Sequence, residues 1–153
     1  MTERERQLAE LFDQLFPVLM QNLLQHVTRE TQKVGLTVAQ FYFLRQLRRD
    51  GPWTAAQVGE ALGITSGPVS GLTKRMITQG LVDRRTDEDD RRVAWFSVTE
   101  RGQALLAEAE RHLLSLWGHI VHEFGAERGG ELLDLLAAVS GVLRQLQPGS
   151  REP

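Results

Sequence analysis

The chain contains 153 residues, with 18 Lys or Arg against 20 Asp or Glu and a formal net charge of −2. This balance excludes a generally basic protein that coats nucleic acid, and the lack of cysteine excludes disulfides, thiolate zinc sites and cysteine redox switches. The length is enough for one sizeable core. No export signal pattern and no apolar run of membrane-spanning length are found, so we expect a cytoplasmic protein without a membrane partner.

The N-terminal segment, residues 1–34, has the pattern of an amphipathic helix. Pro17 lies inside this pattern, and we expect it to kink the helix or to split it near Phe16. Gly35 ends the region, and Thr37 can cap the next helix. The apolar residues that recur at helical spacing include Leu8, Leu11, Phe12, Leu15 and Leu19.

The first of two short helices is predicted to begin after Thr54, whose hydroxyl can accept a backbone N–H of the first turn. Gly63 suits the left-handed residue that ends a helix, and Ile64 is expected to be buried in the turn. On its own, this segment fits any pair of packed helices as well as it fits a DNA-binding one. Its apolar face consists of Ala55, Val58, Ala61 and Leu62.

The second short helix can be capped by Thr65 or by Ser66, and the sequence does not decide between them. Pro68 falls in the first turn, where its missing N–H costs nothing, and Gly80 ends the helix. The predicted buried stripe is Val69, Leu72, Met76 and Ile77. The residues predicted to face outward are Ser66, Gly67, Ser70, Gly71, Thr73, Lys74 and Arg75.

Small residues on the outward face would let the helix backbone approach base edges, and Lys74 and Arg75 can reach phosphate or guanine. An ordinary solvated helix face is the alternative interpretation. The segment that follows favours the first interpretation, because it predicts a hairpin directly after the helix pair.

Residues 81–86 and 93–98 are rich in β-forming residues and are predicted to form two strands. The tip between them carries four consecutive carboxylates, at 87–90, but no histidine or ordering glycine of a metal loop accompanies them. We expect instead that Asp90 holds Arg92 or Arg91 through a charge-assisted bond. An arginine at such a tip can enter a narrow minor groove, although a solvated charged turn is the alternative.

Two further helices are predicted after the hairpin. Thr99 can cap a long helix that Gly125 ends, and Gly129 and Gly130 are expected in or beside a second turn. The final helix is expected to extend to residue 147, followed by a disordered tail at 148–153. The terminal helices carry more apolar surface than one small domain needs, which favours a homodimer over a bundle within one chain.

Three histidines on the long helix were considered as metal ligands, since two of them are spaced i, i+3. A structural zinc site needs four ligands, and the sequence offers no convincing fourth group. We therefore predict no metal and no cofactor, and whether His112, His119 and His122 bind metal stays open.

Four stretches of the chain resemble the MarR family of bacterial winged-helix regulators. They are LGITSGPVSGLTKRM at 62–76, QGLVDRR at 79–85, DEDDRR at 87–92 and VTERG at 98–102. Asp90, Arg91 and Arg92 are similar to the Asp-x-Arg wing of the family, and TVAQFYFLRQL at 37–47 is similar to the helix that precedes its reading head. Where many relatives carry a large polar or basic residue, this chain has Gly71.

This resemblance implies a mainly α fold with a small β-hairpin, in which a winged helix-turn-helix at 35–102 is flanked by dimerisation helices at 1–34 and 103–147. It also implies a small aromatic or phenolic effector in a cleft between the two regions. No ligand contacts are predicted, because aromatic residues at these spacings are more often core. The residues considered for such a cleft are Phe41, Tyr42, Phe43, Trp53 and Trp95. The thiol-based peroxide sensing of some relatives is excluded by the lack of cysteine.

Together the residues and the resemblance predict a homodimer that binds double-stranded DNA site-specifically at a palindromic operator, as a ligand-responsive repressor. The alternative is a winged-helix module that binds protein. An enzyme is not expected, since no nucleophile with an oriented base and no phosphate-binding loop is present. The residues predicted to contact DNA are Thr54, Ser66, Gly67, Pro68, Ser70, Gly71, Lys74, Arg75, Arg84, Asp90, Arg91 and Arg92.

Overall fold

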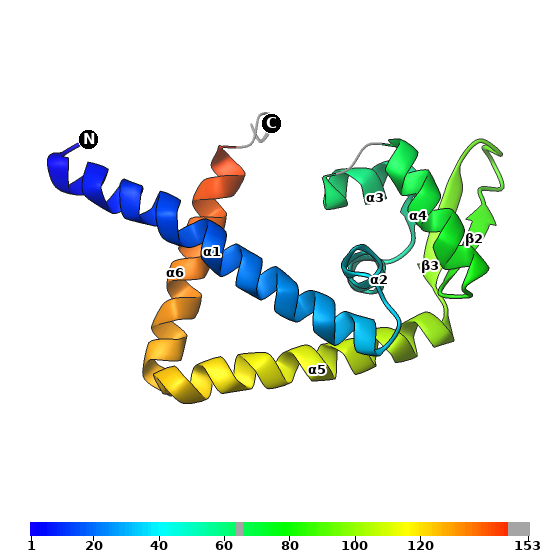
Figure 1. Cartoon of the computed structure of the whole chain (residues 1–153). Coiled ribbons are helices and arrows are strands. Elements are labelled where there is room, and N and C mark those ends of the chain that lie inside the picture. The colour runs from blue at the N-terminus through cyan, green and yellow to red at the C-terminus, as the bar shows by residue number, and fades with distance from the viewer. Residues whose placement is uncertain (64–65, 147–153) are drawn as a thin grey trace. The chain divides into compact units, whose positions relative to one another are not determined.

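The computed structural model describes residues 1–63 and 66–146. It contains a mainly helical fold whose elements are shown in Figure 1. In chain order they are α1 (Glu3–Lys33), α2 (Val38–Asp50), β1 (Trp53–Thr54), α3 (Ala55–Leu62), α4 (Ser66–Thr78), β2 (Val82–Thr86), β3 (Ala94–Val98), α5 (Glu100–Phe124) and α6 (Ala126–Gln145). The chain forms two compact units, one from Met1 to Leu113 and the other from Leu114 onward.

The first unit contains one hydrophobic core, to which α2, α3, α4, the sheet and the first half of α5 all contribute. Its centre consists of side chains that are almost completely buried. They include Phe41, Phe43, Leu44, Val58, Val69, Met76 and Leu106. In α2, α4 and α5 the buried residues recur at helical spacing, so each of these helices turns one apolar face toward a common interior.

The wing is a three-stranded antiparallel sheet with the strand order β1-β3-β2. The two predicted strands are confirmed, each with one residue less at its start. In the register of β2 and β3, Arg84 pairs with Phe96 and Arg85 pairs with Trp95. The strand β1 was not predicted, because a strand of two residues is too short to show an alternating pattern.

Gly102 fixes the start of α5 against the base of the wing. A Cβ atom at this position would lie 2.2 Å from the Leu81 carbonyl oxygen and 2.9 Å from Val98 Cγ1. The predicted cap is also found, since Thr99 Oγ1 accepts the Gly102 N–H at 3.0 Å and donates to the Gly80 carbonyl at 2.7 Å. These contacts of its first turn therefore fix the direction in which α5 leaves the wing.

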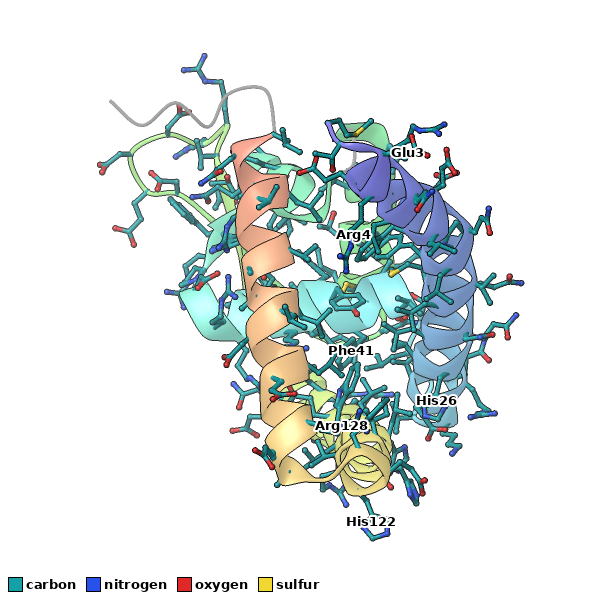
Figure 2. All side chains as sticks on the ribbon, turned by 90° about the vertical axis from the view of Figure 1, so that its left-hand side faces the viewer. Glu3, Arg4, His26, Phe41, His122 and Arg128 are labelled. Carbon is teal, nitrogen blue, oxygen red and sulfur yellow. The ribbon has the colours of Figure 1, made fainter. Side chains whose placement is uncertain are left out.

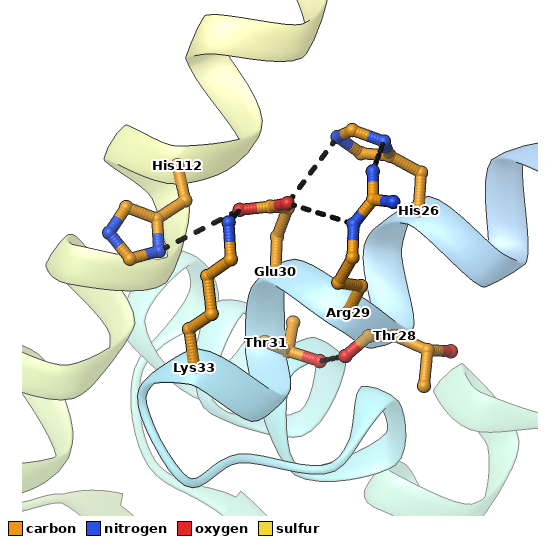
Figure 3. A network of polar contacts seen from close by, with 7 residues as sticks. All are labelled: His26, Thr28, Arg29, Glu30, Thr31, Lys33 and His112. Atoms are coloured by element: carbon orange, nitrogen blue, oxygen red, sulfur yellow. Dashed lines mark hydrogen bonds and ion pairs between the residues drawn. The ribbon is translucent and has the colours of Figure 1, made fainter.

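A buried carboxylate joins α1 to α5 within the first unit (Figure 3). Glu30 accepts a hydrogen bond from Lys33 Nζ at 2.6 Å, and this bond holds the pKa of Glu30 below its usual value. His26 Nε2 lies 3.9 Å and His112 Nδ1 lies 4.0 Å from its oxygens. His112 Nδ1 is buried and has no hydrogen-bond partner within residues 1–63 and 66–146.

Two predicted helix breaks are not found. The helix α1 is not split near Phe16 but contains Pro17, so a kink at this proline stays a prediction, and the residues around this position are exposed. Solvent can therefore satisfy the carbonyl that a proline leaves without a donor. Gly129 and Gly130 lie inside α6 rather than in a turn. Gly125 alone provides the break, with φ +79°, as predicted.

The predicted stripes of α4 also need one correction. Val69, Leu72 and Met76 are buried as expected, but Ile77 is exposed, and Thr73 is buried in its place. The Thr73 hydroxyl donates to the carbonyl oxygens of Val69 and Ser70 at 3.0 and 3.1 Å. A threonine can fill this core position because its hydroxyl finds acceptors on its own helix.

Candidate nucleic-acid interface

The two ends of α3 are capped in the way that the sequence predicted. Thr54 caps α3, because its side chain accepts the Gln57 N–H while the Gln57 side chain accepts the Thr54 N–H. Gly63 takes the left-handed conformation with φ +63° at the C-terminal end of α3. The expected burial of Ile64 and the expected cap at Thr65 fall outside the described residues, and α4 begins at Ser66.

The outward face of α4 presents small residues first and cations afterwards. Gly67, Pro68, Ser70 and Gly71 are exposed on its first turns, and Lys74 and Arg75 are exposed one turn later. A Cβ atom at Gly67 or Gly71 would meet nothing within 4 Å. Neither cationic side chain pairs with a residue that the structure describes, so both can bind an external anion.

The C-terminal end of α4 is tied to α2 by a bond that the sequence analysis missed. Gln40, which is buried, donates from Nε2 to Gln79 Oε1 at 2.6 Å. The Gln40 side-chain oxygen also accepts the Thr37 N–H at 2.9 Å, which completes a capping box. A glutamine three residues after a threonine is the sequence signal of that box, but its second partner lies 39 positions away in the chain.

The wing tip, residues 87–92, holds one arginine in the way that the sequence predicted. Asp90 Oδ1 accepts hydrogen bonds from the Arg92 backbone N–H at 3.0 Å and from Arg92 Nε at 3.1 Å. These bonds hold the pKa of Asp90 below its usual value. The Arg92 side chain is nevertheless 91% exposed, so its guanidinium is oriented by one carboxylate and open to solvent.

The other wing arginines differ from Arg92 in that no described residue binds them. Arg84 and Arg85 are exposed on β2, and Arg91 is exposed in the turn. Arg85 lines a shallow cavity of about 430 Å³ together with Pro52, Trp95 and Ser97. The predicted DNA-contacting residues thus lie along three segments of one unit: the cap of α3, the outward face of α4, and the wing.

The aromatic residues considered for an effector cleft have separate environments. Phe41 and Phe43 are buried in the core, and Tyr42 is exposed and packs against Phe41 with ring centroids 5.2 Å apart. Trp53 packs against the core, whereas Trp95 lines the cavity on the wing.

The three histidines on α5 are not brought together. His112 faces Glu30 in the first unit, whereas His119 and His122 are exposed in the second. Within residues 1–63 and 66–146, no group of three or more His, Asp or Glu has the geometry to hold a metal ion. None of the helices described is long and apolar enough to span a membrane.

The geometry described above is that of a winged helix-turn-helix. A model of the MarR family matches residues 34–93. The organic hydroperoxide resistance transcriptional regulator of Bacillus subtilis (strain 168) is 38% identical over 76 residues, which cover 50% of this chain and 51% of that protein. The chain spans about half the length of the curated relatives it matches.

Solved structures extend the likeness to nearly the whole chain. A crystal structure of a MarR family transcription regulator superimposes with a TM-score of 0.81 and 25% identity, covering 95% of this chain and 96% of the other. The transcriptional repressor CouR bound to a 23-mer DNA duplex gives a TM-score of 0.77 at 23% identity, covering 87% and 94%. Residues 34–93, which include most of the winged helix-turn-helix, therefore match the MarR family, and nearly the whole chain shares the fold of a MarR family transcription regulator.

Proposed function

We propose that this chain binds double-stranded DNA site-specifically as a homodimer and thereby regulates transcription. One observation carries the proposal: α4 presents two cations that pair with no described residue behind a face of small residues, and the wing presents Arg92 already oriented by Asp90. A helix on such a turn fits the major groove, and an arginine on a hairpin tip fits the adjacent minor groove.

The contacts are assigned by segment. The α4 residues Ser66, Gly67, Ser70 and Gly71 approach base edges or phosphate, while Lys74 and Arg75 bind phosphate or guanine. Thr54 and Pro68 lie at the first turns of α3 and α4 and approach the DNA backbone through helix N-termini. On the wing, Arg84 and Arg91 bind phosphate, and Arg92 enters the minor groove with Asp90 as its support.

A homodimer is supported by the apolar side chains that α1 and α6 leave exposed. Leu11, Phe12 and Leu15 on α1 are 60, 67 and 68% exposed, and Leu135 on α6 is 66% exposed. Figure 2 shows the side chains that these two helices carry. Residues 1–34 and 103–147 then form the dimerisation region, and the two copies of α4 contact half-sites about 34 Å apart, one turn of DNA.

We further infer that the regulator is a ligand-responsive repressor of a palindromic operator, with a small aromatic or phenolic effector. The likeness to CouR, which is a repressor, supports the first part. An effector releases DNA only if it binds the non-binding conformer more tightly. Since the chain lacks cysteine, any such response uses a group other than a thiol.

The test is selection of bound duplexes from a random pool, followed by affinity measurements at several salt concentrations. We expect a palindromic motif whose affinity falls steeply as salt rises. Arg92→Ala should weaken binding to the selected site about tenfold through loss of the minor-groove contact. Arg49→Ala is the matched control, because it removes the same charge from an arginine that α2 pairs with Asp50.

If no motif is enriched, or if binding does not depend on salt, the proposal fails. A wing used for protein contact would then be the better explanation. If a motif is found but Arg92→Ala binds it as tightly as the wild-type chain does, the wing assignment alone is wrong.

A further inference from the structure

The Asp87 carboxylate at the base of the wing tip accepts three hydrogen bonds. Its Oδ2 accepts from the Trp95 indole Nε1 at 2.8 Å, and its Oδ1 accepts from the backbone N–H groups of Asp89 and Asp90 at 2.9 and 3.0 Å. These donors, with Trp95 first, hold the pKa of Asp87 below its usual value. An ionised carboxylate only accepts, and both oxygens of this side chain accept hydrogen bonds from within the wing.

The three donors come from two different parts of the hairpin. Trp95 belongs to β3 and lies opposite Arg85 in the sheet, whereas the two backbone N–H groups belong to the tip. Asp87 therefore ties the tip to the regular part of the sheet. The tie is rigid on the strand side, because an indole has only two rotatable bonds and Trp95 is half-buried.

The same bonds continue from Asp87 to Arg92. Asp87 Oδ1 binds the backbone N–H of Asp90, and the Asp90 carbonyl accepts the Val93 N–H at 2.9 Å, so the Asp90 backbone is held on both sides. The Asp90 carboxylate then binds the backbone and Nε of Arg92. A continuous series of hydrogen bonds thus connects a strand residue to Arg92, whose side chain is 91% exposed.

We propose that Asp87 and Trp95 are positioning residues for DNA binding, which orient Arg92 through Asp90 without touching DNA themselves. This inference rests on the proposed function, in which Arg92 enters the minor groove. A guanidinium that is already oriented loses less side-chain freedom on binding, and preorganisation of this kind increases affinity. The acidic tip then serves as an internal set of hydrogen-bond acceptors for the wing.

Trp95→Phe tests the proposal, because phenylalanine keeps an aromatic ring in the sheet and removes the N–H that Asp87 accepts. We expect the affinity for a selected duplex, measured by fluorescence anisotropy, to fall about fivefold, the equivalent of one lost hydrogen bond of ordinary strength. Trp53→Phe is the matched control. It makes the same change in β1, opposite Phe96, at an indole that binds no described residue, and it should change affinity less than twofold.

A double-mutant cycle separates positioning from a structural role. If Trp95 acts through Arg92, Trp95→Phe should cost nothing further in an Arg92→Ala background, whereas simple loss of stability would lower the affinity in both backgrounds. Additive effects would overturn the proposal. So would an unchanged affinity of the Trp95→Phe variant when Arg92→Ala weakens binding, and in that case the proposed DNA-binding function would stand.

Asp87→Asn provides a second variant should Trp95→Phe fold poorly. Its amide oxygen can still accept the two backbone N–H groups, but its NH₂ group faces the indole N–H and cannot accept from it. We expect the same loss of affinity, and the same dependence on Arg92. An unchanged affinity of Asp87→Asn would equally overturn the proposal. An unchanged affinity of Arg92→Ala would overturn both the proposal and the minor-groove contact of Arg92.

Discussion

In the reading head, residues 35–102, the large apolar side chains Phe43, Val58 and Met76 are completely buried, whereas Leu15 of α1 and Leu135 of α6 are about two-thirds exposed. The two regions also differ in their polar contacts. The reading head contains a partly buried bond between Gln40 and Gln79, while the capping box at Thr2 and the ion pairs around Arg6 in the first turns of α1 are all exposed. The core of the reading head is completed by Val27 of α1 and by the first half of α5, whereas α6 and the N-terminal part of α1 leave large apolar side chains exposed.

The change from exposed to buried apolar side chains falls within α1. Leu24 is 54% exposed, and Val27, one turn later, is 4% exposed. From Val27 to the end of the helix, α1 packs on the reading head and carries Glu30, which faces His112 of α5. A single helix therefore belongs to the core at its C-terminal end and offers an apolar stripe at its N-terminal end.

The largest effect is expected from charging that stripe. In the proposed homodimer, Leu11→Glu with Leu15→Glu would bury two carboxylates in an apolar interface, and we expect the dimer dissociation constant to rise about a thousandfold. Sedimentation equilibrium measures this change. Gln14→Glu with Gln21→Glu is the matched control, because helical spacing places both glutamines away from the stripe. A double variant that stays dimeric would show that α1 is not covered by a partner subunit.

In the reading head, by contrast, we expect substitutions that disturb the internal packing to have the largest effect. Gly102→Ala would force a Cβ against the Leu81 carbonyl oxygen, and we expect it to lower the free energy of unfolding by about 3 kcal/mol. Chemical denaturation of both variants at the same protein concentration gives the comparison. Gly118→Ala in the same helix meets nothing within 4 Å, so it should stabilise the protein by about 0.5–1 kcal/mol. Equal effects would mean that α5 does not rest on the wing base.

A smaller effect at Gly71 distinguishes folding from binding within the reading head. A glycine inside a helix costs up to about 1 kcal/mol relative to alanine, and a Cβ at Gly71 has open space around it. Gly71→Ala should therefore raise the melting temperature by a few degrees. If DNA approaches the α4 backbone closely there, the same variant should bind the selected duplex more weakly. Stabilisation with unchanged affinity would place Gly71 outside the contact.

The sequence predicted the elements of the reading head well because each has a local signal. Thr37, Thr54 and Thr99 were recognised as caps, and all three accept the expected backbone N–H groups. A bond between Asp90 and one of the two arginines that follow was also predicted, and the structure has Arg92 as the donor to Asp90.

What the sequence did not reveal depends on contacts between distant positions. The Gln40–Gln79 bond and the role of Trp95 as a donor to Asp87 need the folded hairpin and the packed helices. The exposure of Ile77 and the burial of Thr73 show the same limit, because helical periodicity locates a face only to within one residue.

The smallest effect is expected at Pro68, the third residue of α4. Its backbone nitrogen lies in the first turn, where an N–H group has no carbonyl of the same helix to donate to. The backbone N–H that alanine would introduce therefore gains no helical hydrogen bond. Alanine would lose the restriction that proline places on the unfolded chain, and it would gain helix propensity. These contributions oppose each other, and we expect the free energy of unfolding of Pro68→Ala to change by less than about 0.5 kcal/mol. A loss several times larger in denaturation experiments would mean that the proline, which is exposed, defines where α4 begins, and that the reading head depends on this residue for its geometry.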